Sequence, residues 1–173
     1  MLVHLKSFSS FHSISESIRI EKIDPVTYEN ETVTSLPYLN YIKDNRQDFL
    51  KKLVRTAKDL NINPLWLMHT IFHESRFDPK KSASVSKACG LLSFFPKVLK
   101  DFIDPETGRN LTPNDIIEMT NVEQLDVILS FYKAWIESMQ IKDPIRPGDF
   151  SAITFYPSLI KMKMTWEFPQ YVI

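Results

Sequence analysis

One predicted helix ends in a side chain that could do acid-base chemistry. Asn63 and Pro64 form a typical helix start, and the helix covering PLWLMHTIFHES stops before Pro79, which restrains the residue ahead of it. Glu74 therefore falls in the last turn, where unpaired carbonyls and the helix dipole disfavour its charge. Apolar neighbours add desolvation. The pattern predicts a glutamic acid that retains its proton and acts as a general acid, the alternative being an exposed acid at a helix end.

The same helix carries two histidines four residues apart. His69 and His73 share one helical face, as metal ligands often do. The His-Glu-x-x-His arrangement of zinc peptidases requires a second histidine at position 77, where this chain has Phe77. We therefore expect no metal here, and no cofactor is implied elsewhere.

Helical periodicity dominates the chain after Tyr41. A helix of roughly five turns is predicted over 41–60, and a long one follows Thr120, which forms a capping box with Glu123. Shorter helices are predicted after Thr112 and within PGDFSAITFYP. The expected core positions of the two longest helices are Ile42, Phe49, Leu50, Leu53, Val54, Ala57 and Leu60, and Val122, Leu125, Leu129, Tyr132, Ile136 and Met139.

The fold class expected is mainly α, with three segments. Residues 1–40 are rich in Ser, Thr and Glu, and isoleucines alternate with polar residues in ISESIRIEKI, which favours an extended or β-hairpin arm. Residues 41–165 form the α-helical domain, and residues 166–173 a short tail. With only three glycines, tight strand turns are scarce.

Composition disfavours several classes of partner. The chain has 21 basic and 21 acidic residues, so no net charge favours nucleic acid or an anionic membrane. Cys89 is the only cysteine and cannot form an internal disulfide. Neither an export signal nor a membrane span is expected, because no apolar run is long enough for either.

The residues after Glu74 continue a longer pattern. The segment ESRFDPKKSASVSKACGLLSFFP resembles the signature of the lysozyme-like lytic transglycosylases, the superfamily of goose-type lysozyme, in which E-S-x-F-x-P is followed by G-A-x-G-L-x-Q-x-x-P. The matching positions are Glu74, Ser75, Phe77, Pro79, Ala88, Gly90, Leu91 and Pro96. The later segments LTPNDIIEMTNVEQLDVILSFYKAW and GDFSAITFYP resemble the variant of this domain found in bacteriophage virion proteins.

The chain departs from that signature at a few positions. Ser93 replaces the usual Gln, Lys87 replaces a Gly, and the spacing from Glu74 to Gly90 is one residue longer. The Tyr-Asn pair of cellular members corresponds at best to Tyr156 followed by a proline. These changes concern substrate contacts and leave the acid in place.

The resemblance implies a lysozyme-like fold and cleavage of the β-1,4 bond between N-acetylmuramic acid and N-acetylglucosamine in peptidoglycan. Glu74 would be general acid and then base, and the muramic 6-hydroxyl would close a 1,6-anhydro end without a second carboxylate. An inverting hydrolase would need one about 6.5–9.5 Å away. The candidates for such a partner are Asp78, Asp101, Asp104 and Asp149.

Several neighbours have both a substrate-binding and a structural interpretation. Ser75 could orient the acid or end the helix, and Ser93 could bind an acetamido group or water. Phe77 and Phe95 could line a sugar groove or pack in the core. Tyr156 could hydrogen-bond the acid or pack against the domain.

Gly90 is expected to provide backbone geometry that a side chain would block. Pro79, Ala88, Leu91 and Pro96 complete the structural motif.

Two functions remain open from the sequence. The first is a peptidoglycan-cleaving enzyme of a phage tail or ejection apparatus, acting at the cell wall or periplasm, with residues 1–40 docking onto other virion proteins. The alternative is an inactive lysozyme-like structural or adaptor module of such an apparatus.

Overall fold

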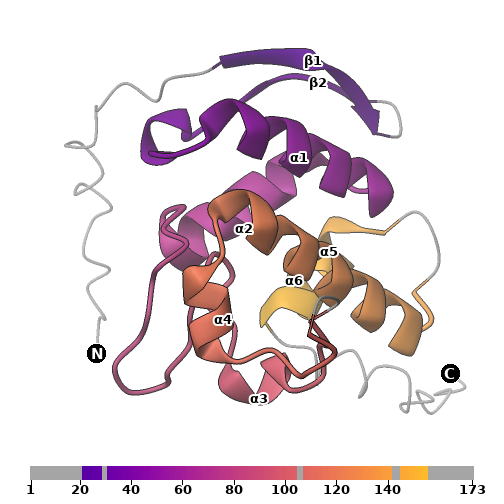
Figure 1. Cartoon of the computed structure of the whole chain (residues 1–173). Coiled ribbons are helices and arrows are strands. Elements are labelled where there is room, and N and C mark those ends of the chain that lie inside the picture. Colours follow the sequence, from indigo (N-terminus) through magenta and orange to yellow (C-terminus); the bar gives the residue numbers. More distant parts are fainter. Residues whose placement is uncertain (1–20, 29–30, 105–106, 142–144, 156–173) are drawn as a thin grey trace, which may run out of the picture.

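The computed structural model describes residues 21–28, 31–104, 107–141 and 145–155. The protein is mainly α-helical, with one antiparallel hairpin ahead of the helices (Figure 1). Its elements are β1 (Glu21–Tyr28), β2 (Glu31–Leu36), the 3-10 turn η1 (Leu39–Tyr41), α1 (Arg46–Asp59), α2 (Pro64–Ser75), α3 (Pro96–Leu99), α4 (Pro113–Glu118), α5 (Asn121–Ser138) and α6 (Pro147–Phe155).

The hairpin is joined to the helical domain by buried side chains. In the antiparallel register Glu21 pairs with Leu36, and a bulge interrupts the pairing after Lys22. Strand β2 packs against α2. Leu36, Leu39 and Ile42 are fully buried in the common core. The segment between β2 and α1 is therefore part of the packed domain.

Helix α1 begins later than its apolar pattern predicts. The pattern starts at Tyr41, whereas the helix starts at Arg46. Asn45 adopts a left-handed conformation with φ 50°, which asparagine tolerates better than most residues, so the helix cannot extend further back. Ile42 still reaches the core, but from an extended backbone with φ −83° and ψ 101°.

The predicted helix starts in the rest of the domain are confirmed. The Asn63 side chain accepts a hydrogen bond from Leu65 N at the start of α2. Capping boxes are present at Thr112, which begins α4, and at Thr120, which begins α5. Each of these signals lies within a few residues of the helix that it starts, which is why the sequence alone could predict them.

Helix α5 lies at the centre of the domain and packs against both α1 and α6 (Figure 1). The apolar stripe predicted for this helix is confirmed only in part: Leu125 and Tyr132 are fully buried, whereas Leu129 is only half-buried. The buried face is also wider than the predicted stripe, because it includes Ile128 and Phe131. A helix with neighbours on two sides buries a wider face than a single stripe. Among the described residues, no helix combines the length and hydropathy needed to cross a bilayer.

Candidate active site

Glu74 lines a pocket of about 470 Å³ at the end of α2. The wall is drawn from parts of the chain far apart in sequence: the segment after α2, the start of α3, the middle of α5 and the end of α6. Besides Glu74, its residues are Lys81, Ala83, Ser86, Ala88, Leu92, Ser93, Phe94, Phe95, Val98, Phe131, Trp135, Ile153 and Thr154. Glu74, a half-buried residue, is thereby placed beside a mostly apolar concave surface.

The backbone of Glu74 is held from two sides. Its carbonyl oxygen accepts hydrogen bonds from the Lys81 ammonium group and from the Ser93 hydroxyl at 3.1 Å. The last carbonyls of a helix have no partner within the helix, so side chains from elsewhere must satisfy them. Here both donors come from the pocket wall, which fixes the main-chain position of the acid relative to that wall.

The end of α2 is a tight left-handed turn. Arg76 and Phe77 have φ of 56° and 61°, a conformation that costs non-glycine residues about 1–2 kcal/mol each. The Arg76 N–H donates to Phe72 O at 3.0 Å, and its guanidinium carbon lies 3.9 Å from the centroid of the Phe72 ring. The Phe77 ring is buried and meets Phe49 edge-on. These contacts offset the strain and end the helix directly after Glu74 and Ser75.

A buried glutamine holds the segment after this turn in place. Gln124, on α5, accepts a hydrogen bond from Leu91 N at 2.8 Å and donates to the carbonyls of Pro79 and Ile116, each at 2.8 Å. Gly90 passes so close that an added Cβ would lie 2.7 Å from Gln124 Oε1 and 2.5 Å from Ile116 Cγ2. Its φ of 75° is also left-handed. A glycine is therefore required here both by backbone conformation and by space.

Short backbone bridges fold the same segment on itself. Cys89 and Phe94 exchange hydrogen bonds of 3.0 and 2.8 Å, and Gly90 N donates to Lys81 O at 2.9 Å. Ser93, with φ 50°, donates its N–H to Gly90 O at 3.1 Å. Pro96 then occupies the first helical position of α3. This compact fold presents Ser93 and its neighbours to the pocket.

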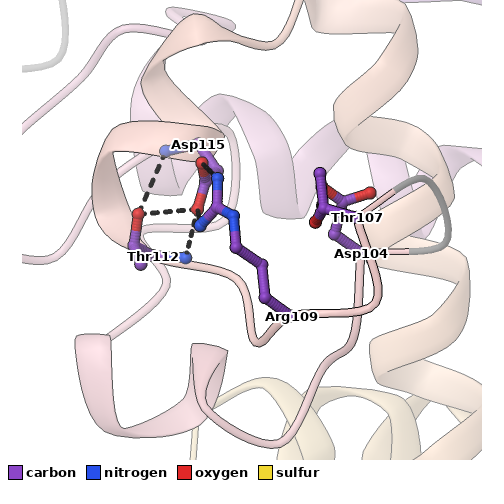
Figure 2. A network of polar contacts seen from close by, with 5 residues as sticks. All are labelled: Asp104, Thr107, Arg109, Thr112 and Asp115. Atoms are coloured by element: carbon purple, nitrogen blue, oxygen red, sulfur yellow. Dashed lines mark hydrogen bonds and ion pairs between the residues drawn. The ribbon is translucent and has the colours of Figure 1, made fainter.

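A polar network fixes the start of α4 (Figure 2). Ile116 of the same helix lies against Gly90. Arg109 donates to both oxygens of Asp115 at 2.9 and 2.5 Å, and Asp115 accepts from the Thr112 N–H and hydroxyl at 2.7 and 2.6 Å. Nearby, Thr107 donates to Asp104 at 2.7 Å. The Arg109 guanidinium, and then Thr112, hold the pKa of the Asp115 carboxyl well below its usual range.

A buried phenol, which does not itself line the pocket, holds one residue of the pocket wall. The Tyr132 hydroxyl lies 2.6 Å from Thr154 Oγ1, and Thr154 donates to Phe150 O at 3.0 Å. Because the single Thr154 hydroxyl hydrogen is used in that bond, Tyr132 is the donor of the pair. Burial raises the pKa of Tyr132, the bond to Thr154 lowers it, and the charge of Glu74 raises it further. Tyr132 therefore stays protonated and keeps Thr154 in place on the pocket wall.

The structure divides the sequence-predicted binding residues between two environments. Ser93 and Phe95 line the Glu74 pocket, where the Phe95 side chain is 55% exposed. Ser75 is buried, and its hydroxyl donates to Ile71 O at 3.1 Å, the bond expected of a serine that ends a helix. Phe77 is also buried, and neither Ser75 nor Phe77 lines that pocket. Tyr156 lies outside the described residues.

Within the described wall of the pocket, Glu74 is the only acidic residue. Asp78 accepts a hydrogen bond from Lys80 N at 2.9 Å and lines a different pocket. Asp101 is exposed, and Asp149 lies in the first turn of α6. None of the four aspartates considered as a second carboxylate lines the Glu74 pocket.

One of the two histidines of α2 contacts the segment that follows β2. His69 Nδ1 lies 3.0 Å from the Tyr38 hydroxyl, and burial and the neighbouring His73 lower the pKa of His69. In the part of the chain that the structure describes, no three His, Cys, Asp or Glu side chains gather as a metal site requires.

Sequence reasoning did not assign a role to Gln124, Phe131, Trp135 or Thr154. Gln124 is fully buried on α5, but it lies outside the stripe of core positions that the sequence predicts for this helix, so its burial became apparent only in the structure. Phe131, Trp135 and Thr154 also carry no signal in the sequence, because aromatic and small polar residues on amphipathic helices are usually packing residues.

Comparisons with known protein families, with curated proteins and with solved structures give no match to this chain. Its function is therefore inferred from the pocket and the sequence pattern.

Proposed function

We propose that this chain is a peptidoglycan-cleaving glycosidase that cuts the β-1,4 bond between N-acetylmuramic acid and N-acetylglucosamine, with Glu74 as its general acid and base. The observation that carries the proposal is the placement of Glu74 at the end of α2 on the wall of the 470 Å³ pocket, its carbonyl held by Lys81 and Ser93. The same wall contains Phe95, an exposed ring suited to packing on a sugar face.

The chemistry needs one acid at the scissile bond. Protonated Glu74 donates its proton to the glycosidic oxygen as the bond to the muramoyl anomeric carbon breaks and positive charge develops on that ring. The resulting carboxylate then takes the proton of the muramic 6-hydroxyl, whose oxygen attacks the anomeric carbon. The products are a 1,6-anhydromuramoyl end and a free 4-hydroxyl, with Glu74 protonated again.

This anhydro-forming route is favoured over inverting hydrolysis by the acids present. Inversion requires a second carboxylate about 6.5–9.5 Å from the first to activate water. Glu74 is the only acid on the described wall of its pocket. An intramolecular nucleophile removes that requirement, because the substrate provides the attacking hydroxyl.

The setting proposed for the activity is a bacteriophage virion, in a tail or ejection apparatus that meets the cell wall. It rests on the resemblance of the α4–α5 region and α6 to the virion-associated variant of the lysozyme-like domain. Residues 1–40 are the proposed docking segment for other virion proteins. Peptidoglycan strands are the proposed substrate.

Digestion of purified sacculi tests the proposal. The full chain is expected to release muropeptides with anhydro ends, identified by chromatography and mass spectrometry. Glu74→Gln should lower the rate by at least about 100-fold, because general acid-base groups contribute 10²–10⁴. Glu137→Gln, an exposed change on α5, is the matched control and should cleave normally.

Intact sacculi after incubation with folded wild-type protein would contradict the proposal, as would equal rates for Glu74→Gln and wild type. Either result favours the other function, a lysozyme-like structural or adaptor module of the phage apparatus. Retained particle assembly by Glu74→Gln together with lost cleavage supports the enzyme.

A further inference from the structure

Lys81 is the only basic residue on the described wall of the Glu74 pocket. It is half-buried, and it is not among the residues that match the lysozyme-like signature. Because an ammonium group loses hydration when it is buried, a lysine in such a place normally has a specific partner. Here the partner is the main-chain carbonyl of Glu74. None of the ion pairs among the described residues joins Lys81 to the Glu74 carboxyl group.

The main chain of Lys81 is fixed on both sides of its Cα atom. Its N–H donates to Asp78 O at 3.3 Å, and its carbonyl accepts a hydrogen bond from Gly90 N at 2.9 Å. Gly90 itself is packed closely, since an added Cβ there would lie 2.7 Å from Gln124 Oε1. The Lys81 ammonium group therefore reaches the end of α2 from an anchored backbone, and less conformational freedom must be lost to keep the contact.

Two donors satisfy the Glu74 carbonyl, and only one of them is charged. The Ser93 hydroxyl donates at 3.1 Å, whereas Lys81 donates with its ammonium group. The carbonyls at the end of a helix carry partial negative charge, which favours the protonated form of a nearby carboxyl group. The Lys81 charge opposes this effect at the carbonyl of the same residue. It therefore stabilises the carboxylate that forms when Glu74 loses its proton.

Few other charged groups face Glu74. The residues that α3, α5 and α6 contribute to the described pocket wall are all uncharged, and β2 and α1, which also pack on α2, contribute none. The titratable groups nearby are the Tyr132 phenol, which senses the charge of Glu74 from α5, and His73, the preceding residue of α2. Arg76 caps the helix, and its guanidinium group stacks on an aromatic ring. Lys81 is thus the cation of the described wall that bonds to Glu74 itself.

We infer that Lys81 is a positioning residue of the proposed glycosidase and acts through the carbonyl of Glu74. It holds the acid against the pocket wall, and its charge favours release of the proton that Glu74 gives to the glycosidic oxygen. The catalytic part of the inference rests on the proposed function. A stronger general acid transfers its proton faster, so the charge contributes at the step in which the glycosidic bond breaks.

Four single variants separate charge from position. Lys81→Met removes the charge and keeps a side chain of similar length, whereas Lys81→Arg keeps the charge. Ser93→Ala removes the uncharged donor to the same carbonyl. Lys80→Met, at the exposed neighbouring position, is the control for loss of a lysine. The readouts are kcat and KM on solubilised glycan strands across pH and, independently of activity, the titration midpoint of the Glu74 carboxyl carbon by NMR, assigned with Glu74→Gln.

We expect Lys81→Met to lower kcat about tenfold with KM within about twofold of wild type. The high-pH limb of its kcat profile and its NMR midpoint should both move upward by about 0.5–1 pH unit, the range of effect that one charge has at a half-buried site. Lys81→Arg should restore both. Ser93→Ala should lower stability and leave the limb and midpoint in place, and Lys80→Met should match wild type.

A limb and midpoint in Lys81→Met equal to those of wild type would overturn the inference and leave the glycosidase intact. A raised KM with unchanged kcat would also overturn it, because Lys81 would then bind substrate instead of positioning the acid. Folded wild type that cleaves no glycan would overturn the glycosidase itself. In that case the NMR midpoints alone decide whether the Lys81 charge acts on Glu74.

Discussion

Replacing Gln124 with methionine is expected to destabilise the domain strongly, although the two side chains have similar length and volume. Gln124 is fully buried and makes three hydrogen bonds of 2.8 Å, to Leu91 N and to the carbonyls of Pro79 and Ile116. Methionine can make none of them, so three main-chain groups lose their partner. Each unsatisfied buried group costs about 1–3 kcal/mol. With partial relaxation of the carbonyls, the free energy of unfolding should fall by about 3–5 kcal/mol.

Urea unfolding followed by circular dichroism measures this loss, and thermal unfolding should show a Tm lower by roughly 6–20 °C for a chain of this size. Ser130→Met, at an exposed position of the same helix, is the control and should change stability by less than about 0.5 kcal/mol. Should Gln124→Met lose less than about 1 kcal/mol, the three bonds do not hold the segment as described. Cleavage of sacculi should fall in parallel, because the same bonds position the pocket wall.

Two further predictions concern Gly90 and Asp115. Gly90→Ala should lower the free energy of unfolding by about 2–4 kcal/mol, from left-handed strain and from a methyl group placed 2.5 Å from Ile116 Cγ2; urea unfolding measures it. The pKa of Asp115 is lowered mainly by Arg109, so the folded state binds this proton less readily than the unfolded chain. Its stabilising contribution is present above the unfolded pKa of about 4 and is lost as pH falls through the folded pKa. In the Asp115→Asn protein, the urea midpoint of unfolding should therefore fall less between pH 6 and pH 2 than it does in the wild type.

Each of these changes has a control in the same chain. Gly148→Ala lies near the start of α6, where an added Cβ meets nothing within 4 Å, and should be neutral or slightly stabilising. A Gly90→Ala protein as stable as wild type would show that the turn can shift without cost. For the acid titration, Asp101→Asn removes an exposed carboxylate. If it flattens the pH dependence as much as Asp115→Asn does, the contact with Arg109 has no special role.

The helices could be predicted because the signals that start them are local. Asn63 ahead of Pro64, and Thr120 with Glu123, specify helix starts within four residues, and the structure has them. The start of α1 was missed because a left-handed Asn45 interrupts an apolar pattern that continues on both sides of it. Periodicity reports which side chains face the core, but not whether the backbone between them is helical.

The site could be predicted only in part, for a related reason. Glu74 stands out because a titratable group ends an apolar helix, and Ser93 follows in the same motif. The opposite wall is built by Phe131 and Thr154, which reach the pocket through the packing of α5 and α6. Such contacts between distant segments leave no pattern in a single sequence, since the same residue types serve equally well in an ordinary core.

The burial of Leu36 has a mechanical consequence. This side chain ends β2 and is fully enclosed in the core, and β2 packs on the helix that carries Glu74. Tension on the chain ahead of the hairpin would enter the domain at Leu36 and be borne directly by α2. If the proposed function holds, an anchor at the amino-terminal end would thus be coupled in series with α2, so that pulling on a tethered particle would load the helix that carries the proposed catalytic acid.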